Sequence, residues 1–189
     1  MKAAQHFLEH GEVLTSVRET LLEKIEKGAS LISDSLGNDG TVFWCGNGGS
    51  ASDSQHLAAE LIGRFKNNRY PLRSLALNSD SSVMTCISND FGYDNLFSRQ
   101  LEGLAKPSDL LVAISTSGSS NNICNVLKMA TKLGVKSIAL LGKSGGSALE
   151  LCDFPIVIPS DSTARVQEMH ILIGHIFCDL VEQNLNVSG

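Results

Sequence analysis

The organisation of this chain is decided by one segment, which reads Thr41-Val-Phe-Trp-Cys45, then Gly46-Asn-Gly-Gly-Ser50, then a helical pattern from Ala51 to Gly63. Its first part is a short, continuous apolar run, which is typical of a strand that is buried on both faces. Glycine and serine then supply a tight turn. A strand, a Gly/Ser loop and a helix in this order predict one unit of a parallel α/β fold.

The same pattern occurs twice more along the chain. The second copy is Asp109–Ser115, the loop Thr116–Ser120 and the helical stretch Asn121–Leu133, and the third is Ser137–Leu141, the loop Gly142–Gly146 and the stretch Ser147–Cys152. Two further strand candidates are Ser74–Leu77 and Phe154–Ile158. Strands that alternate with helices predict an α/β fold with a doubly wound parallel sheet of about five strands.

Long helices bracket this core. Apolar residues form one stripe at Leu14, Val17, Leu21 and Ile25, and Gly37 is the expected end of that helix. We expect the N-terminal helix, residues 1–37, to pack on the α/β core or on a neighbouring subunit. The final helix, from about Ser162 to Gln183, is apolar on most sides, which predicts burial, with a subunit interface as the expected place. No domain boundary is visible, so we expect residues 1–189 to form a single domain.

Composition and charge argue against several classes of protein. The 189 residues contain 15 Lys and Arg against 20 Asp and Glu, so the formal net charge is −5, and 42% of the residues are apolar. An acidic chain without a basic run is a poor partner for nucleic acid. No apolar run approaches the ~20 residues of a membrane span. Met1–Leu14 does not resemble a signal peptide, and the five cysteines are widely spaced without a C-x-x-C motif. We expect a soluble cytoplasmic protein.

The loops that follow the strands are candidate binding sites, because α/β folds bind ligands at the carboxyl ends of parallel strands. Here the loops open helices, so free backbone N–H groups and the positive end of the helix dipole point outward. Hydroxyl groups add neutral donors at Ser50, Ser115, Thr116, Ser117 and Ser120. This set predicts a phosphate site without lysine. Helix caps and tight turns use the same residue types and stay open as an alternative.

Two nucleotide-binding motifs can be set aside. The stretch Gly46–Ala51 matches the glycine pattern of a dinucleotide-binding loop, but the second strand is not followed by a convincing ribose-binding acid. The stretch Gly142-Lys-Ser144 invites comparison with a P-loop, but the earlier glycine that this motif requires is Ser137 here.

Titratable side chains on two helices are candidates for the chemistry. His56 and Glu60 are i and i+4 on the helix after the first loop, so they project from one face. On the final helix, Gln167 and His175 are eight residues apart, about 80° around and ~12 Å along it. His170 competes with His175, and spacing alone does not choose between them. An imidazole and a carboxylate at such positions share a metal ion or simply form hydrogen bonds. The residues alone predict a phosphorylated small-molecule site and no named reaction.

Several separated motifs follow one another along the chain: Cys45–Ser50, Gln55–Leu61, Asn89–Gly92, Phe97–Gln100, Ile114–Gly118 and Thr163–His170, with His175 beyond them. In this order they resemble the sugar isomerase (SIS) domain family and, within it, the phosphoheptose isomerases. The resemblance spans about Thr41 to Glu182. It implies a flavodoxin-like SIS domain and a homotetramer whose active sites are shared between subunits at their interfaces.

The resemblance also implies roles by position. The substrate- and phosphate-binding residues that it implies are Asn47, Gly48, Gly49, Ser50, Glu60, Asn89, Asp90, Ser115, Thr116, Ser117, Ser120 and Gln167. The metal ligands that it implies are His56, Glu60, Gln167 and His175, around one Zn²⁺ per subunit. Glu60 and His175 also carry the acid and base chemistry, which selects His175 over His170. Ser119, Ser162 and Val166 differ from the residues usual in the family, but no catalytic group is missing.

The activity that the resemblance implies is aldose–ketose isomerisation. Such an enzyme converts sedoheptulose 7-phosphate into D-glycero-D-manno-heptose 7-phosphate through an enediol(ate), the first step towards ADP- or GDP-heptose precursors. The alternative is a non-catalytic SIS protein that binds the replication initiator or senses a sugar phosphate. The initiator-binding relative lacks counterparts of Glu60 and His175. Both are present here, which favours the enzyme.

Overall fold

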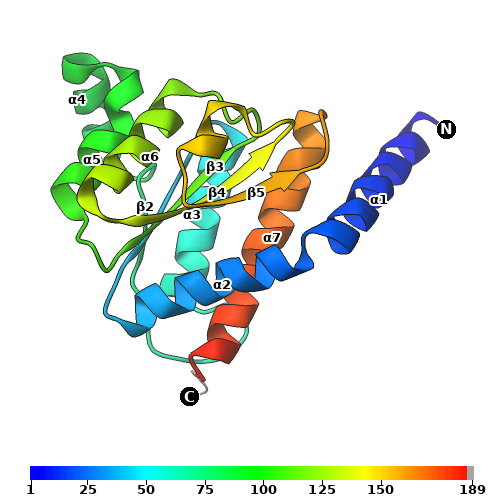
Figure 1. Cartoon of the computed structure of the whole chain (residues 1–189), viewed down its shortest axis with the longest axis horizontal. Helices are drawn as coiled ribbons and strands as arrows, with labels where there is room; N and C mark the ends of the chain where they lie inside the picture. Colours follow the sequence, from blue (N-terminus) through cyan, green and yellow to red (C-terminus); the bar gives the residue numbers. More distant parts are fainter. Residues whose placement is uncertain (187–189) are drawn as a thin grey trace.

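The computed structural model describes residues 1–186, and its centre is a five-stranded sheet (Figure 1). The strands are β1 (Val42–Gly46), β2 (Ser74–Ala76), β3 (Leu110–Ser115), β4 (Lys136–Gly142) and β5 (Phe154–Ile158). They lie in the order β2-β1-β3-β4-β5, and each neighbouring pair is parallel. This confirms the predicted parallel sheet of a doubly wound α/β fold.

The described residues also form seven α-helices. These are α1 (Lys2–Thr20), α2 (Leu22–Gly37), α3 (Gly49–Ile62), α4 (Ser81–Phe91), α5 (Leu96–Leu104), α6 (Asn121–Leu133) and α7 (Thr163–Asn184). Two short 3-10 turns are η1 (Tyr93–Asn95) and η2 (Gly146–Glu150). In Figure 1, α2, α3 and α7 cover one face of the sheet, and α4, α5 and α6 cover the other.

Because both faces are covered, the interior strands are almost entirely buried. Every residue of β1 and β3 is buried. Their side chains alternate between two apolar cores. Trp44 and Val112 belong to the core under α2, α3 and α7, whereas Phe43 and Leu111 belong to the core under α4, α5 and α6. The continuous apolar runs in the sequence follow from this arrangement.

The N-terminal segment differs from the predicted single helix ending at Gly37. It forms two helices, because the backbone at Leu21 (φ −121°, ψ −1°) leaves the helical region. α2 buries Ile25 and its neighbours on the same face against the core. Within α1, from residue 2 to residue 20, only Val17 is buried, and the helix projects away from the sheet (Figure 1).

Other differences concern short elements. The sequence patterns did not predict α4, η1 and α5, although Asp80 before α4 was an available signal. Its carboxylate caps the helix by accepting from the N–H groups of Ser82 and Val83 at 2.9 and 3.0 Å. The helical stretch predicted from Ser147 to Cys152 is the 3-10 turn η2.

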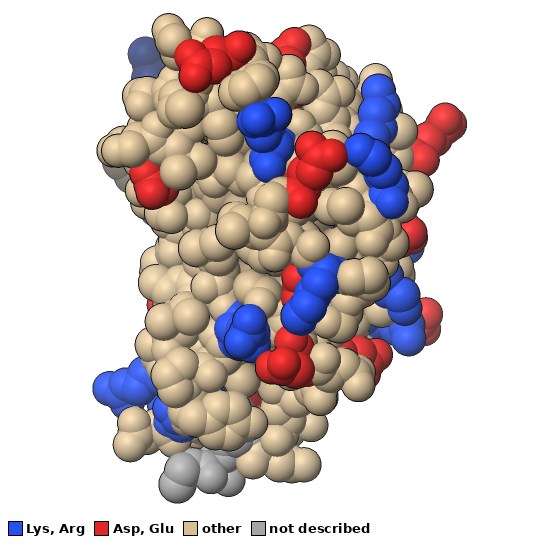
Figure 2. All heavy atoms as spheres, turned by 90° about the vertical axis from the view of Figure 1, so that its left-hand side faces the viewer, with Lys and Arg blue, Asp and Glu red and all other residues tan. Residues whose placement is uncertain are grey.

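The surface over α4, α5 and α6 carries charges of both signs. Figure 2 shows this side of the molecule, on which Lys and Arg side chains alternate with Asp and Glu. On this face the acidic side chains are therefore not gathered in one patch. Among residues 1–186, none of the helices has both the length and the apolar character that crossing a bilayer requires.

Candidate active site

The loops after β1 and β3 meet at the point where the strand order reverses, with β2 on one side and β4 and β5 on the other. β1 and β3 are neighbours, but the helices that follow them, α3 and α6, pack on opposite faces. Open α/β sheets bind ligands in the crevice at such a switch point. Here the loops are joined, since the side-chain amides of Asn47 and Asn122 exchange two hydrogen bonds of 2.8 and 2.9 Å. The Tyr93 hydroxyl also donates to Asn47 Oδ1 at 2.9 Å.

Two glycines shape the first loop. Gly48 has φ +59°, in the left-handed region that favours glycine. Gly49 begins α3, and a Cβ there would clash with the side-chain amide of Gln167. Gln167, the fifth residue of α7, thus packs directly on the start of α3. The buried side chains of Ser50 and Asp53 lie in this part of α3.

The loop after β3 presents hydroxyl groups around a helix start. Ser115 Oγ accepts from the N–H of Gly118 at 3.1 Å, so this hydroxyl shapes the loop and keeps its own hydrogen to donate. Thr116, Ser117 and Ser120 are half-buried in the same loop. Ser120 is the N-cap residue of α6, but its side chain makes no capping hydrogen bond. The helix-cap alternative therefore does not account for the hydroxyl of Ser120.

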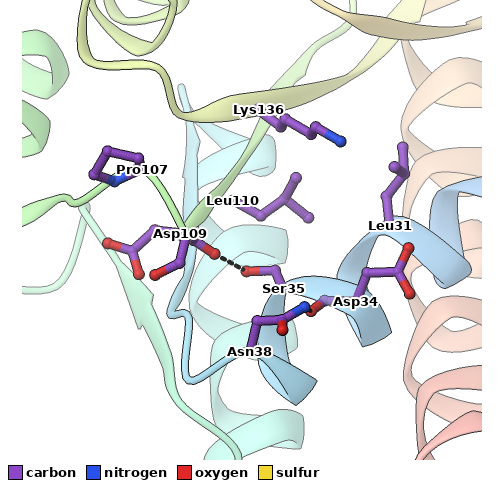
Figure 3. Close-up of a pocket in the computed structure, with 9 residues that line it drawn as sticks. Leu31, Asp34, Ser35, Asn38, Pro107, Asp109, Leu110 and Lys136 are labelled. Atoms are coloured by element: carbon purple, nitrogen blue, oxygen red, sulfur yellow. Dashed lines mark hydrogen bonds between the residues drawn. The ribbon is translucent and has the colours of Figure 1, made fainter.

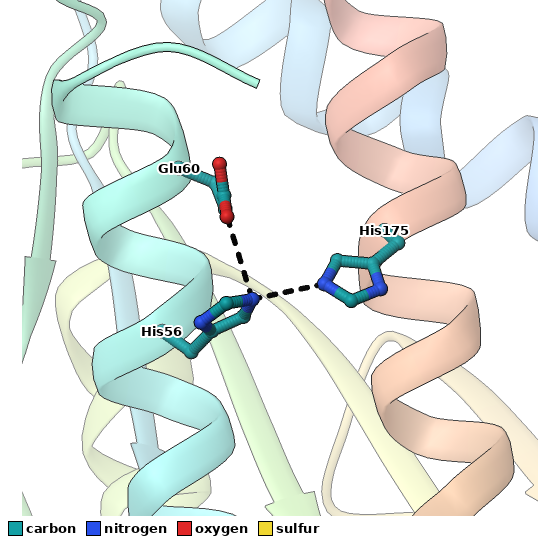
Figure 4. Close-up of side chains that lie close together, drawn as sticks. All are labelled: His56, Glu60 and His175. Carbon is teal, nitrogen blue, oxygen red and sulfur yellow. Dashed lines mark hydrogen bonds and ion pairs between the residues drawn. The ribbon is translucent and has the colours of Figure 1, made fainter. Parts of the chain in front are cut away.

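Three titratable side chains from two helices meet in one cluster (Figure 4). His56 Nε2 lies 2.9 Å from His175 Nε2 and 3.4 Å from Glu60 Oε1. The two imidazole rings are arranged edge to face, with an interplanar angle of 73°. The i and i+4 side chains of α3 thus meet an imidazole that lies 119 residues away in the sequence. We refer to these three residues as the His-Glu-His cluster.

The His-Glu-His cluster fits the ligand preferences of zinc. Two imidazoles and a carboxylate with an open fourth position are a common catalytic zinc set. Ligand atoms about 2.1 Å from a tetrahedral ion lie roughly 3.4 Å apart, and the three ligand atoms here all lie within 4.8 Å of one another. The side chain of His56 is 50% exposed and that of Glu60 is 23% exposed. The cluster is therefore accessible to a small molecule.

The structure distinguishes the two histidines of α7 that spacing left open. His170 is fully buried, and its Nε2 donates to the carbonyl oxygen of Leu141 at 3.0 Å. Burial lowers the pKa of His170 to about 4, although the hydrogen bond to Leu141 opposes this shift. His170 is therefore a neutral core residue, whereas His175 belongs to the His-Glu-His cluster.

Asn89 and Asp90 lie on the last turn of α4, and both are exposed. Asn89 Nδ2 donates to Asp90 Oδ1 at 2.7 Å, and Cys86 Sγ lies 3.7 Å from Asp90 Oδ2. These contacts are local to α4 and do not join the pair to the His-Glu-His cluster. Their role as substrate contacts stays a prediction.

Three residues of the site were not selected from the sequence. Asn122 and Tyr93 orient Asn47. Asp53 is buried on α3, and within the described structure its Oδ2 has no hydrogen-bond partner. Burial raises the pKa of Asp53, although the neighbouring side chains of Gln167 and His56 lower it. No local pattern marks Tyr93 or Asp53. For Asn122, its place just after the Gly/Ser loop was the available signal.

A separate hollow opens at the amino-terminal ends of β3 and β4, opposite the end at which the candidate active site lies (Figure 3). It is lined by Leu110 and Lys136, the first residues of β3 and β4, and by Asp34 and Ser35 of α2. Ser35 Oγ donates to the carbonyl oxygen of Ser108 at 2.9 Å and so ties α2 to the start of β3. Because parallel sheets bind ligands at the carboxyl ends of their strands, this hollow is not the candidate active site.

Comparison with known proteins agrees with this geometry. The SIS domain family model matches residues 5–142. The chain has a parallel α/β fold with Gly/Ser loops at its switch point, and the family model matches most of it. It therefore belongs to the class of SIS-domain proteins.

Individual similar proteins identify the family within this class. The phosphoheptose isomerase of Aliarcobacter butzleri is 48% identical over 188 residues, which cover 98% of this chain and 100% of that protein. The structures of the phosphoheptose isomerases from Neisseria gonorrhoeae and Francisella tularensis match with TM-scores of 0.92 and 0.94, at 39% and 34% identity. Each match covers 96% of this chain and 97% of the other. The chain belongs to the phosphoheptose isomerase family.

Proposed function

We propose that this protein is an aldose–ketose isomerase that converts sedoheptulose 7-phosphate into D-glycero-D-manno-heptose 7-phosphate. Its membership of the phosphoheptose isomerase family supports this reaction. The observation that carries the proposal is the meeting of a carboxylate from α3, Glu60, with an imidazole from α7, His175. A non-catalytic role in binding a protein or sensing a sugar phosphate does not require that pair and is not favoured.

Isomerisation moves one proton between two carbons and another between two oxygens. The proton on C1, next to the C2 carbonyl, is a weak acid, so a base must be held against it and the enediolate charge must be stabilised. In this mechanism Glu60 takes the proton from C1 and returns it to C2. His175 gives a proton to O2 and accepts the proton from O1. The substrate and the product therefore have the same atoms, and the acid and the base are regenerated.

The phosphate group of the substrate binds in the loop after β3. Hydroxyl groups and the first N–H groups of α6 are neutral donors that suit a dianion at a helix N-terminus. This part of the site consists of Ser115, Thr116, Ser117 and Ser120. The sugar lies between this loop and α3, where its contacts are Asn47, Gly48, Gly49, Ser50, Gln167, Asn89 and Asp90.

We further propose that the His-Glu-His cluster binds one Zn²⁺ per subunit, with Gln167 as the fourth protein ligand. When bound, the ion would supply a Lewis acid for the carbonyl oxygen of the sugar. Glu60 has two carboxylate oxygens, so it is able to hold a cation with one and accept a proton with the other. An amide oxygen is a weaker zinc ligand than imidazole or carboxylate. The cluster therefore accounts for most of the affinity.

Removal of the metal tests this part of the proposal. We expect exhaustive chelation to lower the isomerase activity about tenfold or more, and added Zn²⁺ to restore it. Full activity in protein without metal by elemental analysis would contradict the zinc proposal and leave Glu60 and His175 as acid–base catalysts.

We propose that the enzyme is a cytoplasmic homotetramer with active sites at subunit interfaces. The span 1–189 acts as one SIS domain, of which residues 187–189 lie outside the described part. Phe7 and Leu8 on α1 are 79% and 62% exposed, which favours burial against another subunit. All five cysteines are free, which fits a reducing compartment.

Incubation with sedoheptulose 7-phosphate, followed by NMR, tests the reaction. We expect anomeric proton signals of an aldoheptose 7-phosphate to appear as the ketose is consumed. In D₂O, deuterium at C2 of the product would report proton transfer through a base that exchanges with solvent. Fructose 6-phosphate, a shorter ketose phosphate, is the control for substrate length. If the metal-replete protein yields no aldoheptose phosphate, the proposed function is wrong.

A further inference from the structure

The carboxylate of Glu182, near the end of α7, is the centre of a buried hydrogen-bond network. It accepts from the backbone N–H groups of Phe65, Lys66 and Asn67 at 3.0, 3.2 and 3.0 Å. It also accepts from Asn67 Nδ2 at 3.1 Å and from Arg69 Nε at 2.9 Å. Burial would raise the pKa of Glu182, but these hydrogen bonds outweigh that effect and hold the pKa below its usual range. Glu182 is therefore ionised at neutral pH.

The guanidinium of Arg69 joins this carboxylate to the end of α3. Its Nη2 donates to the carbonyl oxygen of Glu60 at 2.9 Å, and its Nη1 donates to the carbonyl oxygen of Leu61 at 2.8 Å. Both carbonyls belong to the last turn of α3, where a helix leaves its C=O groups without partners of its own. The side chains of Arg69 and Glu182 are fully buried. One buried ion pair thus caps α3 and binds it to α7.

The same network places an aromatic ring against the candidate site. Glu182 holds the backbone of Phe65, and the Phe65 ring stacks on the imidazole of His175, with centroids 5.6 Å apart and an interplanar angle of 21°. Along α7, Glu182 follows His175 by seven residues, which puts the two side chains on one face, about 10 Å apart. The network therefore touches both helices that supply the His-Glu-His cluster.

We infer that the ion pair of Arg69 and Glu182 is a positioning device for the candidate active site. It fixes the backbone of Glu60, the Phe65 ring against His175, and the separation of α3 and α7 at which the cluster forms. Arg69 and Glu182 are positioning residues, because they act through Glu60 and His175. The catalytic meaning of this inference rests on the proposed function, but its effect on metal binding does not.

The buried ion pair of Arg69 and Glu182 is held in one arrangement by its hydrogen bonds. Each charge is buried and makes several hydrogen bonds, so loss of one partner leaves the other charge without compensation and allows the loop between α3 and β2 to shift. Metal sites are sensitive to such support, since altering the groups that orient the ligands typically weakens metal affinity or activity by 10- to 100-fold. If the network only stabilised the fold, its loss would lower the unfolding temperature and leave metal affinity and activity unchanged.

The first test compares Glu182→Gln with Lys66→Gln. The control removes the ion pair of Lys66 with Asp179 (2.8 Å), which joins the same loop to the same helix but is partly exposed. For Glu182→Gln we expect Zn²⁺ affinity, measured by competition with a chromophoric chelator, to fall about 10- to 100-fold. The kcat should fall by a similar factor while KM changes less than about threefold, because the phosphate loop is untouched. Lys66→Gln should change each quantity less than about twofold.

A second variant tests the inference if Glu182→Gln does not fold. Phe65→Leu removes the ring from His175 but keeps the backbone N–H that Glu182 binds, and we expect lower kcat and weaker Zn²⁺ binding at nearly unchanged Tm. Wild-type kcat and Zn²⁺ affinity in a folded Glu182→Gln protein, or in Phe65→Leu if the first does not fold, would overturn the inference. A wild-type protein that binds Zn²⁺ but does not isomerise the substrate would overturn the proposed function alone.

If the wild-type protein binds no Zn²⁺, the crystal structure of Glu182→Gln, or of Phe65→Leu if Glu182→Gln does not fold, decides the question. Separation of the His56 and His175 rings by more than about 1 Å relative to the wild type would support the inference. Unchanged ring positions would overturn it.

Discussion

His170 and His175 lie five residues apart on α7, yet their surroundings give them different chemistry. His170 is enclosed by the core and hydrogen-bonded to Leu141, so its imidazole stays neutral. His175 is half-buried beside His56, Glu60 and the Phe65 ring. Spacing could not distinguish them, because His170 lies only three residues from Gln167 and His175 lies eight residues from it. The resemblance to the family selected His175, and burial now supplies the physical reason.

Acid is expected to destabilise the protein through His170. The unfolded residue has a pKa of about 6.5 and the folded one about 4, so between these values the unfolded state binds more protons and stability rises with pH. The contribution is complete above pH 6.5 and is lost as the pH falls towards 4, on the order of 3 kcal/mol in total. Urea unfolding at pH 7 and pH 5 checks this. Between these pH values, the free energy of unfolding of His170→Gln should fall by about 2 kcal/mol less than that of the wild type. Equal decreases in the two proteins would contradict this role of His170.

Replacing Glu60 by glutamine is expected to remove the base and keep the shape of the site. We predict that Glu60→Gln lowers kcat by about 10²- to 10⁴-fold, the usual contribution of a positioned general base. Steady-state kinetics with sedoheptulose 7-phosphate measure this. The control is Glu102→Gln, a change at an exposed carboxylate paired with Lys132. Near-normal turnover in Glu60→Gln would exclude Glu60 from the mechanism.

Strands and helices differed in how well their residue patterns predicted them. The predicted bounds of β5 and α6 agree with the structure residue for residue, and the other strands agree to within one residue at each end. Strands buried on both faces leave continuous apolar runs, which few other structures produce. By contrast, α4 and α5 were not predicted, although Val83, Met84 and Ile87 of α4 and Leu96, Phe97 and Leu101 of α5 contribute to the apolar core. These helices have only 11 and 9 residues, and in so short a stretch the apolar spacing does not separate a helix from a buried strand.

The start of α6 offers a matched pair of serines for testing phosphate binding. Ser120 is half-buried and its side chain makes no capping bond, whereas Ser119 is exposed and donates to the carbonyl oxygen of Ser117. We predict that Ser120→Ala raises KM about 10- to 100-fold, because a hydrogen bond to a charged group is worth about 1.5–3 kcal/mol. Ser119→Ala should leave KM within about twofold. Equal effects of the two changes on KM would contradict the assignment of Ser120.

The arrangement of α1 relative to the rest of the chain points to assembly. The sheet, α2, α3 and α7 share one apolar core, whereas α1 extends away from the sheet and contacts the start of α7 through polar groups such as His10 and Glu168 (Figure 1). The break at Leu21 separates α2, which packs on the core, from α1, of which only Val17 is buried there within residues 2–20. Of the predicted apolar stripe, Val17, Leu21 and Ile25 lie in the core, whereas Leu14 is exposed.

Changes on α1 are expected to weaken the tetramer. We predict that the double substitution Phe7→Glu and Leu8→Glu lowers the molar mass measured by light scattering after gel filtration, because charges replace apolar side chains that need a partner surface. Activity per subunit should fall as well, since the active sites are proposed to be shared. Leu104→Glu, at an exposed apolar residue on the opposite face, is the control. A tetramer that persists in the α1 variant, or a monomeric wild type, would contradict this assembly.

The sequence by itself determined the order of strands, Gly/Ser loops and helices, and the pairing of His56 with Glu60 on one helical face. These features depend on neighbours a few residues apart, so a local pattern contains them. Only the tertiary structure decided that α7 brings His175 to that pair and buries His170, and that Glu182 binds a loop 113 to 117 residues away. Such contacts depend on how whole helices pack across the sheet, and that packing is set by the entire core at once.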